Sequence, residues 1–225
     1  MSRSRMALIG ATLAVAGGLL WFALRDKAQS SPPRAVDAIA SVGIPTVTGP
    51  PLLATPRFQP PEQKTVTVEG KTHAFTERRY DPPFALPQLD RRPPDAWMAT
   101  PEAAMTSYAS AMGRANWEWW QSMWDPASQA ISQQHYREVE AEKHISVRDE
   151  MVKGWRTEYA GRGQVLVRRI DIPGYVIVYL RRADQPDSAP AAMTPLALKQ
   201  VGDHWVVTHD LMGHPVYFYD SLRTE

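Results

Sequence analysis

The sequence predicts an α+β fold in which three helices pack on the concave face of a curved antiparallel sheet of four to five strands. Between residues 101 and 159, apolar residues recur at spacings of three and four, as in amphipathic helices. From residue 165 onward, apolar and polar residues alternate in runs that glycine-containing turns separate, as in hairpins. Helices followed by antiparallel strands are typical of the α+β class, which here occupies residues 96–225.

The helices are predicted from their capping residues. Thr100-Pro101-Glu102 places a hydroxyl at the N-cap, proline at the first helical position and an acid in the first turn. Asn116 is expected to cap a short second helix that Asp125-Pro126 ends. Ser146 begins a motif similar to a capping box and is expected to open the third helix. The polar stretch 129–142 between them fits either a helix or irregular structure.

The strands are predicted from alternation around turn dipeptides. Pro173-Gly174 and Gly202-Asp203 are the turn signals of two antiparallel hairpins. The expected strands are Val165–Ile172, Tyr175–Arg182, Ala192–Val201, His204–Leu211 and a short aromatic strand at Val216–Tyr219.

Two linking segments precede the predicted domain. Residues 25–63 are rich in proline, which blocks helices and sheet ladders, so they are expected to form an extended spacer; a docking strip for a partner is the alternative. Residues 64–95 are expected to be a β-hairpin, turning at Glu69-Gly70-Lys71, and an irregular connector. Two strands alone are marginally stable, so the hairpin is expected to lean on the domain or on a partner.

The leader predicts a membrane anchor. Residues 6–24 are 19 uncharged residues between basic flanks, which as a helix span about 28 Å, close to the bilayer core. The alternative is a cleaved signal peptide ending at Ala14-Val15-Ala16, but cleavage there leaves the apolar Gly17–Leu24 exposed. We therefore expect an uncleaved inner-membrane helix, with residues 1–5 as a cytoplasmic tail and the C-terminal domain in the periplasm or outside.

Within the expected membrane helix, Gly10, Ala14 and Gly18 form a stripe of small residues. This spacing lets two helices approach closely in lipid, so the stripe is a candidate surface for self-association or partner pairing. The simpler interpretation is a membrane segment that is merely rich in alanine and glycine.

Tryptophan is the most distinctive residue of the expected helices. Trp117, Trp120 and Trp124 share one face of the second helix and are expected to pack inside, whereas Trp119 is expected at the surface or at an interface. Together with a tyrosine, a further tryptophan and a histidine, they form the candidate pocket or interface. Its residues are Tyr108, Trp117, Trp119, Trp120, Trp124, Trp155 and His209.

These residues also carry a family resemblance. The progression Thr100-Pro101-Glu102-Ala103-Ala104, Tyr108, Asn116-Trp117 and Met123–Ser128 resembles the opening of NTF2-like domains, which are cystatin-like α+β cones. In architecture the resemblance covers residues 98–212; the dense tryptophans and Asn116, where Gly-Asp is usual, depart from it. It implies a cone whose pocket is catalytic, ligand-binding or filled. Membrane-tethered members resemble scaffold subunits of secretion and envelope assemblies.

A catalytic cone requires an ionisable group with a shifted pKa inside it. The candidates are Asp171, His209, Asp210, Tyr108, Tyr175 and Tyr179. His209 shares a strand face with Trp205 and Val207, which favours a core histidine over a catalytic one. The six histidines show no ligand pair on one face and cysteine is absent, so neither a metal site nor a cofactor is predicted.

The net charge and the clusters of arginine bear on which kinds of partner the protein has. The net charge of +1 argues against a nucleic-acid-binding protein. Arg168-Arg169 and Arg181-Arg182 lie on paired strands, either as a basic patch or as ordinary solvated residues. We therefore expect a non-catalytic, single-pass scaffold or accessory subunit of a secretion-like envelope assembly, whose partners are the inner membrane and other envelope proteins. The alternative is an NTF2-like small-molecule-binding protein or an isomerase- or hydrolase-type enzyme.

Overall fold

The computed structural model describes residues 52–185 and 194–218. The expected membrane helix, its small-residue stripe and most of the spacer lie outside these residues. No helix formed by the described residues combines the length and apolar character that crossing a bilayer requires. The elements below all belong to one unit of the chain, residues 54–225.

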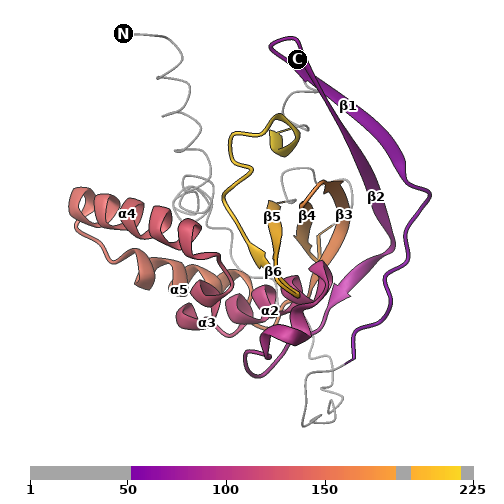
Figure 1. Ribbon diagram of the computed structural model, residues 1–225. Helices are drawn as coiled ribbons and strands as arrows, with labels where there is room; N and C mark the ends of the chain where they lie inside the picture. The colour runs from indigo at the N-terminus through magenta and orange to yellow at the C-terminus, as the bar shows by residue number, and fades with distance from the viewer. Residues whose placement is uncertain (1–51, 186–193, 219–225) are drawn as a thin grey trace. The chain divides into compact units, whose positions relative to one another are not determined.

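A six-stranded sheet is the centre of this unit, and all its neighbouring strands are antiparallel and follow chain order (Figure 1). The strands are β1 (Glu62–Val68), β2 (Lys71–Leu86), β3 (Gln164–Ile172), β4 (Tyr175–Arg182), β5 (Thr194–Val201) and β6 (His204–Val207). The expectation of four to five strands was too low, because the upstream hairpin joins the sheet when β2 pairs with β3. The last expected hairpin strand ends early, at Val207.

The predicted irregular connector is wrong in its first part, because residues 81–86 continue β2. The register of β2 against β3 shifts between Arg79 and Phe84, which places the prolines of this stretch at a bulge, where strands tolerate them. Beyond the bulge, Phe84 and Leu86 are buried. Strand β2 is therefore long enough to pair along both halves of β3.

Four α-helices and two 3-10 helices complete the unit. They are η1 (Asp95–Met98), α2 (Pro101–Gly113), α3 (Trp117–Ser122), α4 (Pro126–Lys143), α5 (Val147–Glu158) and η3 (Pro215–Phe218). The predicted caps Thr100, Asn116 and Ser146 are confirmed, since each side chain accepts a backbone N–H of the following turn. The count of three helices was wrong because Asp125 does more than end α3: its side chain accepts the N–H groups of Ala127 (3.1 Å) and Ser128 (3.3 Å) and starts α4.

The predicted final strand at 216–219 is also wrong, because the structure has η3 there. The Val216 N–H is donated to His214 Nδ1 (3.3 Å), so the chain turns instead of pairing. Val216 and Tyr217 are buried, and the Tyr217 hydroxyl donates to the Pro195 carbonyl (3.0 Å). The His214 ring meets His73 of β2 edge-on at 4.9 Å, so η3 lies against the first hairpin.

The helices and η3 lie on opposite faces of the sheet. Arg169 of β3 is directly opposite Arg78 and bonds Glu102 of α2, so this face receives the helices. His73 lies an odd number of residues from Arg78, and side chains alternate along a strand, so its contact with His214 places η3 on the other face. Apolar residues are buried on both faces: α2 and α3 cover the first, and on the second Phe75, Ile170 and Ile177 are buried on the side of η3.

Glu102 ties α2 to the sheet. Its side chain is 3% exposed, accepts the Tyr80 hydroxyl (2.7 Å) and pairs with Arg169 Nη1 (3.2 Å). Burial and the Glu102 carboxylate together raise the pKa of Tyr80, so this phenol stays protonated and remains a donor.

We expect Glu102→Leu to lower the free energy of unfolding by roughly 3–5 kcal/mol, because removing one partner leaves buried polar groups uncompensated. The matched control is Glu118→Leu, which removes an exposed pair with Arg148 and costs less than about 1 kcal/mol. Urea denaturation of both variants measures the difference. Equal losses would contradict the role given to Glu102.

Candidate functional site

The structure brings most of the candidate aromatic residues into one cluster. Trp120 is its centre, with ring centroids 5.3 Å from Trp117, 5.4 Å from Trp124, 5.3 Å from Trp155 and 6.1 Å from Tyr108. All five rings are buried. Rings at these separations are in direct contact, so the space between α2, α3 and α5 is filled by side chains.

Trp119 is separate from this cluster. The expectation of a surface or interface residue was wrong, since its side chain is 5% exposed. Its Nε1–H donates to Ser107 Oγ of α2 (2.9 Å), and the Ser107 hydroxyl in turn contacts Met123 Sδ (3.0 Å). The short helix α3 is therefore covered on two sides, which the spacing of its tryptophans alone does not reveal.

His209 lies at the end of the aromatic cluster. Its ring is half-buried, 4.6 Å from the Trp124 ring, and its Nδ1 has no hydrogen-bond partner among the described residues. Burial lowers the pKa of His209 despite the nearby Asp125 and Asp210 carboxylates. The imidazole is therefore neutral at physiological pH and packs on tryptophan, as expected for a core histidine.

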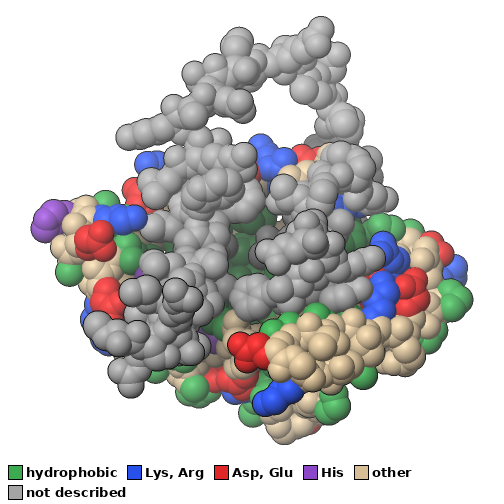
Figure 2. Space-filling view, turned by 90° about the horizontal axis from the view of Figure 1, so that it is seen from above, with side chains coloured by type: hydrophobic (Ala, Val, Ile, Leu, Met, Phe, Trp, Pro, Cys, Tyr) green, Lys and Arg blue, Asp and Glu red, His purple; other side chains and the backbone are tan. Residues whose placement is uncertain are grey.

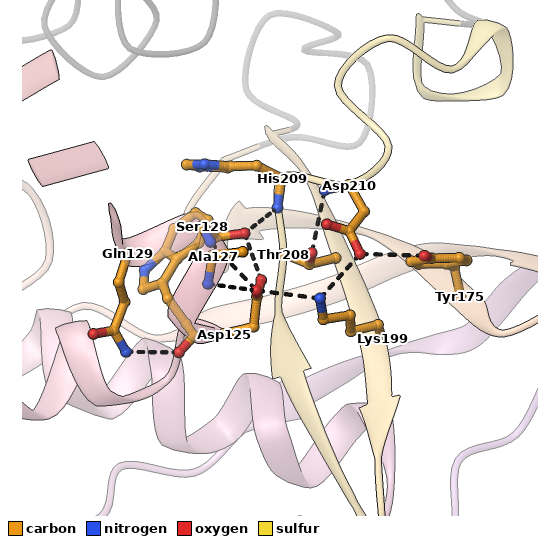
Figure 3. Close-up of polar contacts among 10 residues, drawn as sticks. Asp125, Ala127, Ser128, Gln129, Tyr175, Lys199, Thr208, His209 and Asp210 are labelled. Carbon is orange, nitrogen blue, oxygen red and sulfur yellow. Dashed lines mark hydrogen bonds and ion pairs between the residues drawn. The ribbon is translucent and has the colours of Figure 1, made fainter. Parts of the chain in front are cut away.

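A polar cluster lies beside His209, where α4 begins and β6 ends next to β5 (Figure 3). Lys199 Nζ lies 3.1 Å from Asp125 Oδ1 and 3.0 Å from Asp210 Oδ2. The Tyr175 hydroxyl donates to the same Asp210 oxygen (3.2 Å). Ser128 completes the cluster: its hydroxyl donates to Asp125 and accepts the His209 N–H (2.7 Å).

The charges of this cluster satisfy one another. Burial disfavours ionised Asp125, but hydrogen bonds from Ser128, Lys199 and Thr208 outweigh it and lower the pKa of the carboxyl. Burial likewise opposes the charge of Lys199, yet the two carboxylates raise its pKa. An ionised acid and an ionised amine in contact leave neither a free base nor a free nucleophile, so the cluster fastens α4 to the sheet edge.

The Ser128, His209 and Asp125 side chains do not form a hydrolytic triad. A triad requires the imidazole to bond the hydroxyl and the carboxylate. Here only the backbone N–H of His209 bonds Ser128 (Figure 3). The His209 ring lies tilted against the Trp124 ring instead. Asp125 and Lys199 were not among the sequence candidates; the signal for Asp125 was its position before Pro126, as a helix cap.

The remaining catalytic candidates have structural partners. Asp171 pairs with Arg78 (2.9 Å) and Arg169 (2.6 Å). The Tyr179 ring lies under the Arg168 guanidinium, 3.7 Å from its centroid. Tyr108 is buried, and this burial raises its pKa, so it is not an acid at neutral pH.

The four arginines of the paired strands do not gather into one patch. Arg168 pairs with Glu77 (3.4 Å), while Arg169, on the opposite face, pairs with Glu102 and Asp171. Arg181 donates to the Gln185 carbonyl (2.6 Å), and its neighbour Arg182 pairs with Glu158 (2.7 Å). Where Figure 2 shows described side chains, acidic and basic groups are intermixed around the rim.

The structure also shows a surface depression that the sequence did not suggest. A surface depression of about 370 Å³ lies between the start of α3 and one face of α5. Its lining residues are Ala115, Trp117, Glu118, Arg148, Asp149, Val152, Lys153 and Arg156. Trp117 belongs both to this lining and to the aromatic cluster, so the depression lies at the outer margin of the cluster. Among the described residues, no group of three histidine or acidic side chains is arranged to hold a metal ion.

Comparison with known proteins adds no assignment. Neither family models, nor curated proteins, nor solved structures give a match to the chain. The NTF2-like resemblance stays a prediction, and the coarser α+β class is what the structure establishes.

Trp120→Ala is expected to lower the free energy of unfolding by about 3–5 kcal/mol, since it empties the centre of the aromatic cluster. Trp205→Ala is the control, because Trp205 on β6 is only half-buried and its loss is expected to be smaller. Guanidinium denaturation measures both. A loss below about 1 kcal/mol for Trp120→Ala would mean that the interior is not filled as described.

Stability is expected to depend on pH through His209. Its folded-state pKa lies below the ordinary 6.5, so folding favours the neutral ring. The contribution of the neutral ring to the free energy of unfolding is fully present above pH 6.5 and is lost as the pH falls from there through the folded-state pKa. His209→Gln should flatten this part of the stability–pH curve. His214→Gln is the comparison, because burial and the neighbouring His73 also lower the pKa of His214. An NMR titration with the His209 pKa above 6.5 would contradict this.

Proposed function

We propose that the chain is a membrane-anchored, extracytoplasmic scaffold or accessory subunit of an envelope assembly, with a domain of the NTF2-like type that acts by protein–protein contact. The observation that carries the proposal is the filled interior. In a cone-shaped domain a ligand binds in the interior beside the helices, and here Trp120 and the four rings around it fill the interior between α2, α3 and α5. Contact with partners then takes place on the outside of the domain.

The ionisable groups support the same proposal. General acid–base catalysis needs a group that gains or loses a proton near neutral pH at the reacting atoms. Asp125 and Lys199 form an ion pair, Asp171 pairs with two arginines, and His209 packs on Trp124. These ion pairs and this packing stabilise the fold and leave none of these groups placed for catalysis.

The helices α4 and α5 supply a contact surface. Figure 1 shows α4 and α5 side by side, projecting away from the sheet. Helix α4 is about 27 Å long, and only Ser128 and Val139 along it are buried. Ile131 is 52% exposed on this helix. A long, exposed helix on a rigid base is suited to partner binding, which is typical of an accessory subunit.

The anchor supports the location. The apolar residues 6–24 have the length of a membrane span. The proline-rich residues that follow, from 25 to the first hydrogen bond with β2 at Arg57, give a reach of up to about 100 Å. A folded unit on such a spacer stays near the membrane without being held against it.

The surface depression between α3 and α5 favours a second candidate function, small-molecule binding. Its volume of about 370 Å³ falls in the range of ligand sites. However, charged side chains dominate its lining, whereas most ligand sites are largely apolar. Saturable shifts of the amide signals of residues 115–118 and 148–156 on adding a small molecule would favour this candidate.

The scaffold proposal predicts that partner contact depends on the anchor. A photo-reactive residue at Ile131 is compared in the full chain, in a chain lacking residues 1–27, and in a chain whose residues 6–24 are replaced by an unrelated apolar helix. We expect the full and helix-swapped chains to resist carbonate extraction and to crosslink the same partners, and the truncated chain to lose them.

A photo-reactive residue at Val201, exposed at the β5–β6 turn, is the control for non-specific capture. The proposal fails if the mature full chain is found free in solution. It also fails if the truncated chain captures the same partners as the full chain.

A further inference from the structure

Among the residues that the structure describes, one edge of the sheet is covered and the backbone of the other edge has no strand beside it. At β6, Val207 donates its N–H to the Met123 carbonyl (2.8 Å), and its own carbonyl accepts the Asp125 N–H (3.0 Å). The chain entering α4 thus covers this edge. At the other end of the strand order, no described residue pairs with the outer side of β1.

The turn between β1 and β2 determines which groups face outward. Glu69 (φ 51°) and Gly70 (φ 75°) both have positive φ, as in a type I′ two-residue turn. In such a hairpin the flanking Val68 and Lys71 exchange both hydrogen bonds, and the pattern alternates from there. The backbone N–H and C=O groups of Gln63, Thr65 and Thr67 therefore point away from β2.

Strand β1 lacks the devices that usually block an open edge. Its pairing with β2 runs without a register shift, so it has no bulge, and it contains no proline. Its single lysine, Lys64, is held on one face of the sheet by Glu62 (2.9 Å) and Glu77 (3.0 Å) and is not directed along the edge. Such an edge is suited to accept another strand.

We propose that β1 pairs antiparallel with β1 of a second copy of the chain, about a two-fold axis at Thr65. In this register Thr65 faces Thr65, and each Gln63 faces the other copy's Thr67. These three pairs place outward groups opposite one another, and each exchanges two hydrogen bonds. Two six-stranded sheets become one continuous sheet.

Charge selects this register over its neighbour. Lys64 faces the second copy's Val66, and Glu62 faces its Val68, so no like charges oppose each other directly. The neighbouring register centred at Lys64 keeps outward groups paired but brings Lys64 opposite Lys64, which is unfavourable. The neighbouring register centred at Val66 pairs Thr65 with Thr67 and so keeps two outward pairs in place of three. Because the β6 edge is already covered, pairing stops at a closed dimer and does not continue into a fibre.

The contact is a small one. A seven-residue edge buries less than the ~1,200–2,000 Å² of stable complexes, so pairing is weak in dilute solution. Confinement to a membrane raises the effective concentration and makes a weak contact sufficient. The strength of pairing, though not its geometry, therefore rests on the proposed anchoring.

The first experiment uses single cysteine substitutions in the full chain, which has no native cysteine. Thr65→Cys is placed at the two-fold axis, where paired Cα atoms are about 5.5 Å apart, within disulfide range. Thr72→Cys, on β2, is the matched control, because three strand spacings and a four-residue offset along the strand put the two copies about 20 Å apart. Mild oxidation in membranes should give a disulfide dimer with the Thr65→Cys chain alone. Equal crosslinking of both variants, or none of the Thr65→Cys chain, overturns the proposal.

The second experiment compares Thr65→Pro with Thr65→Val. Proline removes an outward N–H that β2 does not use, so the fold tolerates it while edge pairing is blocked. Energy transfer between donor- and acceptor-labelled Lys143→Cys chains, in lipid vesicles and in detergent, measures association. We expect Thr65→Pro to weaken association about tenfold or more, and Thr65→Val to leave it unchanged.

Persistent transfer with Thr65→Pro would assign association to another surface, such as the small-residue stripe of the anchor, and would overturn the proposal. Absence of transfer in the unmodified chain would also overturn it. Circular dichroism checks the fold of Thr65→Pro; if that variant is unfolded, the pair of cysteine variants decides. Neither experiment needs an envelope partner, so failure to capture one counts against the proposed function alone.

Discussion

The pairing of β2 with β3 is the constraint on which the rest of the structure depends. The four α-helices that the structure describes lie between these strands in the sequence, so their pairing closes the helical segment into a loop over the sheet. The register places Arg78 opposite Arg169 and Arg79 opposite Arg168. Like charges directly opposite destabilise a sheet, so this junction needs compensating acids.

Three acidic residues supply the compensation. Asp171 pairs with Arg78 and Arg169 on the helix face, where Glu102 of α2 adds a second carboxylate. On the other face, Glu77 is 1% exposed and pairs with Lys64, Arg79 and Arg168. From the sequence, Arg168-Arg169 could be a basic patch and Asp171 a catalytic residue. In the structure their ion pairs stabilise the pairing of β2 with β3, two strands that are distant in the sequence.

Sequence reasoning predicted the local elements better than the long-range pairing. Caps such as Thr100 and Ser146 act within one turn, so their side-chain chemistry suffices to locate helix starts. The place of the first hairpin depends on β3, more than 75 residues further on, and no local pattern reports such a contact. Asp125 takes part in both kinds of interaction: it caps the helix that follows it directly, and it also pairs with Lys199, which is distant in the sequence. Trp119 was misplaced for the same reason, since Ser107 covers it from another helix.

The strand order also decides which surfaces the domain can use at once. Strand β1 lies at one edge of the sheet, whereas α4 starts from the chain that covers β6 at the opposite edge. A contact at β1 and a contact on α4 are therefore separated by the full width of six strands, and neither blocks the other. A dimer formed through β1 would carry its two α4 helices at the far ends of the joined sheet. Two exposed helices on one rigid sheet allow bivalent binding, in which the second contact is strengthened by the first without any new interaction.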